Sequence, residues 1–191
     1  LSDPETLKIF RHLWTATEFD LDTEEFFINE YRELFTLGDL LKKIEHLTWE
    51  KSYTMADRLI SILPAKHKNL PKLRLDVARN PGSFSGKFQS KVKEYPEEEY
   101  FQYLYAKLLL DNDEETKASN ILLKVNPKRH FEQWWKLKNI AVRNALKVQD
   151  FKRAYDLTKN HNLSYGADLA EAEWLAGWIS LRYLKDATAS C

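Results

Sequence analysis

Length, composition and charge restrict both the fold of the chain and its partners. The 191 residues include 29 basic and 29 acidic side chains, so the formal net charge is zero. Affinity for nucleic acid comes largely from neutralising phosphates, and this balance therefore argues against a nucleic-acid partner. Only five glycines and six prolines interrupt a sequence rich in Ala, Leu, Lys and Glu, which are strong helix formers. We predict an all-α protein.

The cysteine content, the length of the apolar runs and the first residues bear on disulfides, membrane spans and targeting signals. The one cysteine, Cys191, cannot form an intramolecular disulfide or a Cys-based metal cluster. No apolar run is long enough to span a bilayer, and residues 1–10 lack the basic-then-apolar plan of a signal peptide. Because the chain does not begin with methionine, we interpret it as a mature or excised segment, from which a targeting signal could have been removed.

Helix start and stop signals then follow one another along the chain. Asp3 before Pro4 predicts the start of a first helix, and Thr23-Glu24-Glu25 predicts the start of a second. Further on, Pro64, Pro96 and Pro127 stand 32 and 31 residues apart. Since a proline disfavours helical geometry in the residue before it, each marks a helix end. The four helix pairs predicted around these breaks are 39–47 with 53–63, 70–79 with 84–94, 97–110 with 114–125, and 131–147 with 151–160.

The regular spacing of these pairs predicts a repeat architecture. Periods in this range are typical of helix-hairpin repeats. Ala56, Ala118 and Ala154 occupy corresponding places in three of the second helices, where a small side chain lets the two helices of a hairpin approach closely. We expect a right-handed α-solenoid of stacked hairpins, similar to tetratricopeptide repeats, with residues 1–191 in a single domain.

A tryptophan-rich segment over residues 170–186, AEAEWLAGWISLRYLKD, lies close to the end of the chain. Asp168 followed by Glu171 fits a capping box, so the last helix is predicted to begin there. At about 100° per residue, Trp174 and Trp178 lie on one side and apolar residues continue around nearly the whole helix. This pattern predicts a helix enclosed by neighbours. A helix so enclosed leads us to expect that the natural chain continues beyond Cys191.

The same segment resembles a known family. Residues 174–184, WLAGWISLRYL, are similar to the EWLAGWIALRFL signature in the helical region of soluble lytic murein transglycosylases. Shorter similar segments precede it in the same order: 10–14 with Phe19, 34–36 with Asp39, 47–50, and 56–59 with 63–64. Two features depart from the family, because Gly38 stands where acidic residues are common and residues 70–94 have only a general helical character.

The resemblance implies a fold, a location and a role. Its members are periplasmic and cleave peptidoglycan glycan strands to 1,6-anhydromuropeptides, using a glutamate in a Glu-Ser motif of a separate lysozyme-like domain. This sequence contains no Glu-Ser dipeptide. The resemblance therefore implies the amino-terminal, U-shaped superhelical domain, without catalytic residues of its own. Its expected partners are the glycan strand and the linker and catalytic domains of the full-length protein.

Candidate binding residues are few. Trp134, Trp135 and Tyr103 belong to an aromatic group for which we favour packing between hairpins, with stacking on a sugar ring as the alternative. The five histidines are scattered without a metal-ligand spacing, and no glycine-rich phosphate loop is present, so we predict neither a metal nor a cofactor. Short basic groups such as Lys42-Lys43 have acidic neighbours, and a solvated face is expected for them.

A different class of function fits the same features. A stand-alone tetratricopeptide-like scaffold, which binds another protein, also has balanced charge and repeated helix pairs. We keep it as the alternative prediction.

Overall fold

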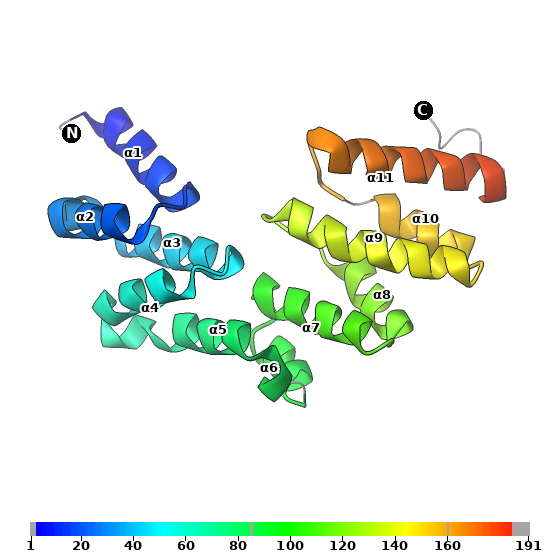
Figure 1. Ribbon diagram of the computed structural model, residues 1–191, viewed down its shortest axis with the longest axis horizontal. Helices are drawn as coiled ribbons and strands as arrows, with labels where there is room; N and C mark the ends of the chain where they lie inside the picture. The colour runs from blue at the N-terminus through cyan, green and yellow to red at the C-terminus, as the bar shows by residue number, and fades with distance from the viewer. Residues whose placement is uncertain (1–2, 85, 160, 185–191) are drawn as a thin grey trace. The chain divides into compact units, whose positions relative to one another are not determined.

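The computed structural model describes residues 3–84, 86–159 and 161–184, and over them the chain is all-helical, with no strand. The predicted fold class is therefore confirmed at this level; Asn160, Lys185, Asp186 and Cys191 lie outside the described residues. The described helices are α1 (Pro4–Ala16), α2 (Leu21–Tyr31), α3 (Leu37–Trp49), α4 (Tyr53–Ile62), α5 (Asn69–Arg79), α6 (Phe88–Glu94), α7 (Glu99–Asp111), α8 (Glu115–Lys124), α9 (Phe131–Lys147), α10 (Phe151–Lys159) and α11 (Gly166–Ile179), drawn in Figure 1.

The helix bounds agree closely with the predicted ranges. Asp3 caps α1, since its Oδ2 accepts a hydrogen bond from the Thr6 amide at 2.8 Å. The second helix begins two residues earlier than predicted, because Asp20 caps it through the Thr23 amide at 2.7 Å. Short polar side chains at these positions satisfy amide groups that the first turn of a helix leaves without an intrahelical partner.

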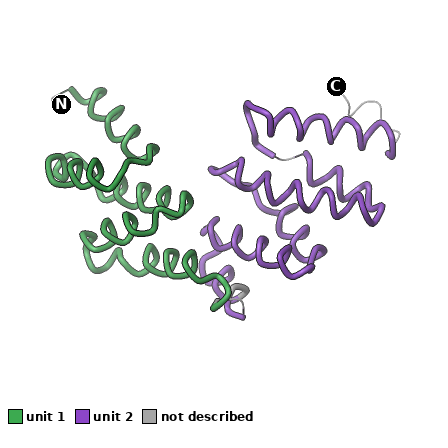
Figure 2. The backbone as a smooth tube through the Cα atoms, viewed as in Figure 1, with its two compact units in different colours: residues 1–84 green, residues 85–191 purple. Residues whose placement is uncertain are grey.

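Two compact units divide the chain, residues 1–84 and 85–191 (Figure 2). Unit 1 is organised around α3, which packs against α1, α4 and α5. Its core includes Trp14, which stacks on Phe35 with ring centroids 3.9 Å apart. Leu40, Ile44 and Leu47 form the buried stripe of α3, each 0% exposed. That a single domain includes both units stays a prediction.

Unit 2 is organised around α9, which packs against α7, α8, α10 and α11. Each helix from α7 onward contacts the next one, and α7, α8 and α9 also contact the next but one. Its core contains both small and large apolar side chains, and Phe101, Ala106 and Leu122 are all fully buried. This pattern of neighbour contacts places the two helices of a hairpin against the first helix of the following hairpin.

Three hairpins share one turn geometry, at the α3–α4, α7–α8 and α9–α10 connections. The first helix of each ends in a left-handed residue that is not glycine: Lys51 (φ 64°), Asp113 (φ 57°) and Gln149 (φ 63°). The amide of the next residue donates to a carbonyl five residues back, in Ser52 to Leu47 at 2.9 Å, Glu114 to Leu109 at 2.8 Å and Asp150 to Ala145 at 2.9 Å. These bonds are those of a Schellman motif, which satisfies the carbonyls of a helix end.

The second helix of each hairpin starts from that same turn. In each second helix the amide of the alanine donates a hydrogen bond to the carbonyl of the turn residue four positions before it. These bonds are Ala56 to Ser52 at 3.1 Å, Ala118 to Glu114 at 3.1 Å and Ala154 to Asp150 at 3.0 Å. All three alanine side chains are 0% exposed. The predicted correspondence of the three alanines is thus confirmed, and each lies where the two helices of its hairpin diverge from the turn.

The tryptophan-rich helix α11 differs from its prediction. It begins at Gly166, and no side chain caps it, so the predicted capping box at Asp168 is wrong. Glu171 is instead used between helices: its carboxylate accepts from Arg143 Nη2 at 2.8 Å. The Asn139 side chain donates to the other oxygen of this carboxylate, so two residues of α9 occupy the oxygens that a capping box would have used.

Burial of α11 is also one-sided rather than nearly complete. Leu175 and Ile179 are buried, whereas Trp174 is 63% exposed, and Leu181, in the turn Ser180–Leu184 that follows the helix, is 58% exposed. The Trp174 and Trp178 rings stack in parallel, with centroids 5.9 Å apart. A Cβ built on Gly177 meets no atom within 4 Å among the described residues. The sequence pattern identified the apolar faces correctly, but only one of them is covered.

Candidate functional site

The residues predicted for glycan contact lie together in unit 2, at the contact between α7 and α9. Trp134 is 0% exposed and Trp135 1% exposed, so neither ring presents a face to solvent. Tyr103 is half-buried and packs edge-on against Trp134, with ring centroids 5.4 Å apart. Both tryptophans therefore fit the prediction that they pack between helices. Stacking on a sugar ring stays a prediction, and of the three residues only Tyr103 is partly accessible for it without a rearrangement.

A buried ion pair in unit 1 is the most unusual polar feature of the described chain. Lys43 Nζ lies 3.0 Å from Glu24 Oε2, and both side chains are 0% exposed. The lysine also donates to the carbonyls of Trp14 at 3.0 Å and Thr17 at 2.5 Å. It therefore joins the carboxyl end of α1 and a carboxylate of α2 to α3, which carries it.

The predicted solvated position of Lys43 is wrong. The stripe of α3 that faces the core advances from Leu40 to Ile44 and Leu47, and Lys43 lies within that stripe. Its neighbour Lys42 is exposed. The spacing of Lys43 from Leu40 and Leu47, rather than its residue type, is the sequence signal that indicates burial.

Burial and the partner's charge shift the pKa values of Glu24 and Lys43 in opposite directions. Burial raises the pKa of Glu24, and the nearby Lys43 charge lowers it again in part. Burial lowers the pKa of Lys43, and the Glu24 charge raises it in part. The ammonium also lies 5.2 Å from the Trp14 ring centroid and 4.9 Å from that of Phe19, so aromatic faces supply further favourable charge interaction.

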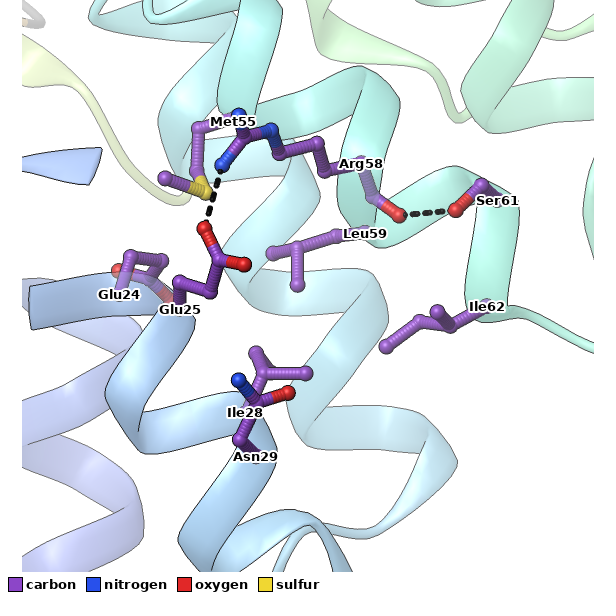
Figure 3. A pocket seen from close by; sticks show the side chains of 9 residues that line it. All are labelled: Glu24, Glu25, Ile28, Asn29, Met55, Arg58, Leu59, Ser61 and Ile62. Atoms are coloured by element: carbon purple, nitrogen blue, oxygen red, sulfur yellow. Dashed lines mark hydrogen bonds and ion pairs between the residues drawn. The ribbon is translucent and has the colours of Figure 1, made fainter. Parts of the chain in front are cut away.

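A pocket of about 190 Å³ opens between α2 and α4, beside this ion pair (Figure 3). Figure 3 shows Glu25 from α2 reaching Arg58 from α4, and their ion pair at 3.1 Å bridges the two helices. Glu24 also belongs to the wall. The residues lining the pocket are Glu24, Glu25, Ile28, Asn29, Met55, Arg58, Leu59, Ser61 and Ile62.

The pocket combines apolar walls with one buried acceptor. Ile28, Met55, Leu59 and Ile62 supply most of the apolar wall, and Met55 and Leu59 are buried. The Glu24 carboxylate in this wall is fully buried, and hydrogen bonds from Lys43 and Trp14 lower its pKa against the effect of burial. Buried polar atoms are nearly always paired, and these two residues of the chain supply the donors for this carboxylate.

Metal chemistry finds no support among the residues that the structure describes. They contain no group of three or more His, Cys, Asp or Glu side chains arranged to hold an ion. A separate search of the described helices finds none with the length and apolar character needed to cross a bilayer.

Sequence reasoning did not identify this pocket. Its walls come from Glu24–Asn29 and Met55–Ile62, about thirty residues apart, and nothing in either segment indicates how far α2 stands from α4. The acidic pair Glu24-Glu25 was interpreted only as a helix start, and Arg58 only as part of the family-like segment 56–59.

Comparisons with known proteins give no further identification: the chain matches no protein-family model, no curated protein and no solved structure.

Proposed function

We propose that this chain is a non-catalytic scaffold, a right-handed solenoid of tetratricopeptide-like hairpins, that belongs to a periplasmic soluble lytic transglycosylase. In this role it holds or guides the peptidoglycan strand and positions a separate lysozyme-like catalytic domain. Cleavage to 1,6-anhydromuropeptides is assigned to that other domain, and the 191 residues themselves contribute binding surface and shape.

The repeated hairpin is the observation that carries the scaffold proposal. Three connections use the same Schellman turn, and each is followed by a fully buried alanine. Four residues further on stand Ile60, Leu122 and Thr158, which are also buried. An alanine followed four residues later by a large residue is part of the tetratricopeptide pattern, which the hairpins with Ile60 and Leu122 match and the hairpin with Thr158 does not. Stacking such hairpins buries a continuous core and leaves an extended surface for binding.

The link to peptidoglycan rests on the sequence resemblance around residues 174–184. Sedimentation with purified peptidoglycan sacculi tests it directly. We expect the protein to pellet with sacculi and to release no 1,6-anhydromuropeptides. Protein that remains in the supernatant, at a concentration where a known peptidoglycan-binding domain pellets, would contradict the glycan role.

A matched pair of variants tests the predicted contact residue. Tyr103→Ala removes the half-buried ring that packs on Trp134, and Tyr105→Ala removes another half-buried tyrosine two residues along α7. We expect Tyr103→Ala to weaken sedimentation at least threefold more than Tyr105→Ala, as loss of a stacking contact of about 1 kcal/mol would do. Equal weakening by both variants assigns glycan contact elsewhere.

A protein-binding scaffold is the second candidate, favoured by one observation. The exposed side chains of Trp174 on α11 and of Leu181 in the turn that follows it, Ser180–Leu184, form an apolar face, and such faces are typical of protein interfaces. If sacculi fail to retain the protein, while Trp174→Ala abolishes capture of a specific protein partner, this candidate replaces the first.

A further inference from the structure

We propose that a second pocket, between the start of α8 and the turn from α9 to α10, binds a neutral polyhydroxylated molecule, with a single pyranose ring as the chemical class. Glu115 and Thr116 from α8, Asn144 from α9 and Arg153 from α10 belong to its wall. The site lies wholly in unit 2. Tyr103 does not line it, and the site rests neither on the sequence resemblance nor on binding to sacculi.

A buried hydroxyl that the chain leaves without a hydrogen bond is the observation that points to a ligand. Ser119 is 3% exposed and lines the pocket. A serine or threonine inside a helix often donates to a carbonyl three or four residues back, as Thr48 does to Ile44 and Thr158 does to Tyr155, both at 2.7 Å. The Ser119 hydroxyl makes no such bond, and no other described residue pairs with it. Since buried polar atoms are nearly always paired, this hydroxyl is available to a ligand.

A half-buried amide lines the same pocket from α9. The side chain of Asn144 makes no hydrogen bond to any residue that the structure describes. Asn139, on the same helix, uses both ends of its amide, since it accepts from Arg143 at 2.7 Å and donates to Glu171. An asparagine amide offers two donors and an acceptor oxygen. Asn144 and Ser119 therefore give the pocket donors and acceptors that the described chain leaves unused.

The charges around the pocket favour a neutral ligand. Arg153 pairs with Asp150 at 3.1 Å, and Glu115 adds an exposed carboxylate. An anionic ligand would meet two carboxylates. A cation would find only the exposed Glu115, whose attraction solvent screens. Hydroxyl groups both donate and accept, so a polyol suits this mixture of carboxylate, guanidinium, amide and hydroxyl groups.

The volume and the apolar part of the wall favour one ring. The pocket encloses about 170 Å³, room for a six-membered ring with its substituents. Ala145 and Val148 contribute carbon atoms to the wall, as small-molecule sites combine apolar walls with a few placed polar groups. A pyranose has hydroxyls around its edge and C–H groups on its faces. Its closed ring also loses less conformational freedom on binding than an open-chain polyol does.

The amide of Asn144 makes this site observable. In a ¹⁵N-labelled protein its side-chain NH₂ group gives a pair of NMR signals, which are identified by their loss in Asn144→Asp. The probes are methyl α-D-glucopyranoside and 2-methoxytetrahydropyran, which share the ring and the methoxy group, whereas only the glucoside carries hydroxyls. We expect the glucoside to shift the Asn144 signals saturably, and the tetrahydropyran to leave them in place over the same concentration range.

A matched pair of serine variants tests the buried hydroxyl. Ser119→Ala removes that hydroxyl alone and should raise the half-saturation concentration of the glucoside about fivefold, the ratio for a hydrogen bond of ordinary strength. Ser61→Ala, at an exposed serine of α4 in unit 1, should leave the half-saturation concentration unchanged. Circular dichroism checks that both variants are folded.

Three results would overturn the proposal. They are Asn144 signals that do not move with the glucoside, signals that respond equally to both probes, and a Ser119→Ala protein with the same half-saturation concentration as Ser61→Ala. Should Ser119→Ala fail to fold, the comparison of the two probes on the wild-type protein still decides the outcome. Because the probe is a free monosaccharide, this test and the sedimentation with sacculi can each fail without the other.

Discussion

The two units of this chain each bury a lysine, and they do so in different chemical surroundings. In unit 1, Lys43 is 0% exposed and faces the Glu24 carboxylate and two backbone carbonyls. In unit 2, Lys138 is 2% exposed on α9, and burial lowers its pKa to about 8. Where a carboxylate is close, its charge offsets part of the cost of burial, and the pair becomes a structural connection between helices. Where burial dominates, stability depends on pH.

The buried pair of unit 1 gives the largest expected effect. Lys43→Met should destabilise the protein by about 3–5 kcal/mol, because it leaves Glu24 buried without its cation. The double variant Lys43→Met with Glu24→Leu should recover most of that loss, since no buried charge remains. Urea unfolding of the wild type, Lys43→Met, Glu24→Leu and the double variant measures both the loss and the recovery of stability.

An exposed pair in the same unit provides the control. Glu25 and Arg58 lie 3.1 Å apart, with side chains 59% and 52% exposed. Arg58→Met should cost less than about 1 kcal/mol, because solvent screens the pair. If Arg58→Met and Lys43→Met cost the same, burial is not what makes the Glu24–Lys43 pair important.

The next largest expected effect is a pH dependence of the unfolding free energy that comes from Lys138. Its pKa falls from 10.5 in the unfolded chain to about 8 in the folded protein, so the folded state loses the proton first as pH rises. The unfolding free energy of the wild type, relative to Lys138→Met, should therefore rise by about 3 kcal/mol between pH 7.5 and 10.5. As pH falls through 8, this contribution is lost.

Subtraction of the variant removes the other groups that titrate in the same range, provided that both proteins remain folded by circular dichroism. A difference between wild type and Lys138→Met that stays flat from pH 7.5 to 10.5 would show that Lys138 keeps an ordinary pKa, and the contrast between the units would disappear.

The hairpin alanines should respond alike in both units. Ala56→Leu and Ala154→Leu each add a large side chain where the wild-type one is 0% exposed, and each should cost about 1–3 kcal/mol. Ala170→Leu, at an exposed position of α11, should change stability by less than about 0.5 kcal/mol. A tolerated Ala56→Leu beside a damaging Ala154→Leu would mean that the two hairpins are packed differently.

The smallest effect concerns the left-handed turn residues. Lys51→Gly in unit 1 and Gln149→Gly in unit 2 should each stabilise the protein by about 0.5–1 kcal/mol, because glycine adopts positive φ without steric cost. Val148→Gly is the control, since Val148 has φ −93°, and glycine there only adds freedom to the unfolded chain. Thermal unfolding measures all three, and a loss of stability in Lys51→Gly would contradict the prediction.

The sequence was informative about helices because their limits depend on local chemistry. Both bounds of α9 were predicted, and most others fell within two residues, since prolines, polar turns and caps act on their immediate neighbours. The alanines at 56, 118 and 154 were matched correctly although they are unequally spaced, because each is placed by its own turn.

Burial and the pocket depended on contacts between distant residues, which the local pattern does not contain. Lys43 follows the spacing of the α3 core stripe, yet lysine is so seldom buried that composition suggested the opposite. The apolar faces of α11 were visible in the sequence, but which face a neighbour covers was not. The candidate site arises from the separation of α2 and α4, a distance that no residue in either helix specifies.

The repeated Schellman turn also bears on how the chain acquires its structure. Each turn closes through bonds between residues three to five positions apart, and the next helix starts from the same residue. Contacts of such short sequence separation cost little chain entropy to form, and proteins rich in them fold quickly. Each hairpin is thus a segment that can form early, with the apolar surface between hairpins assembling afterwards.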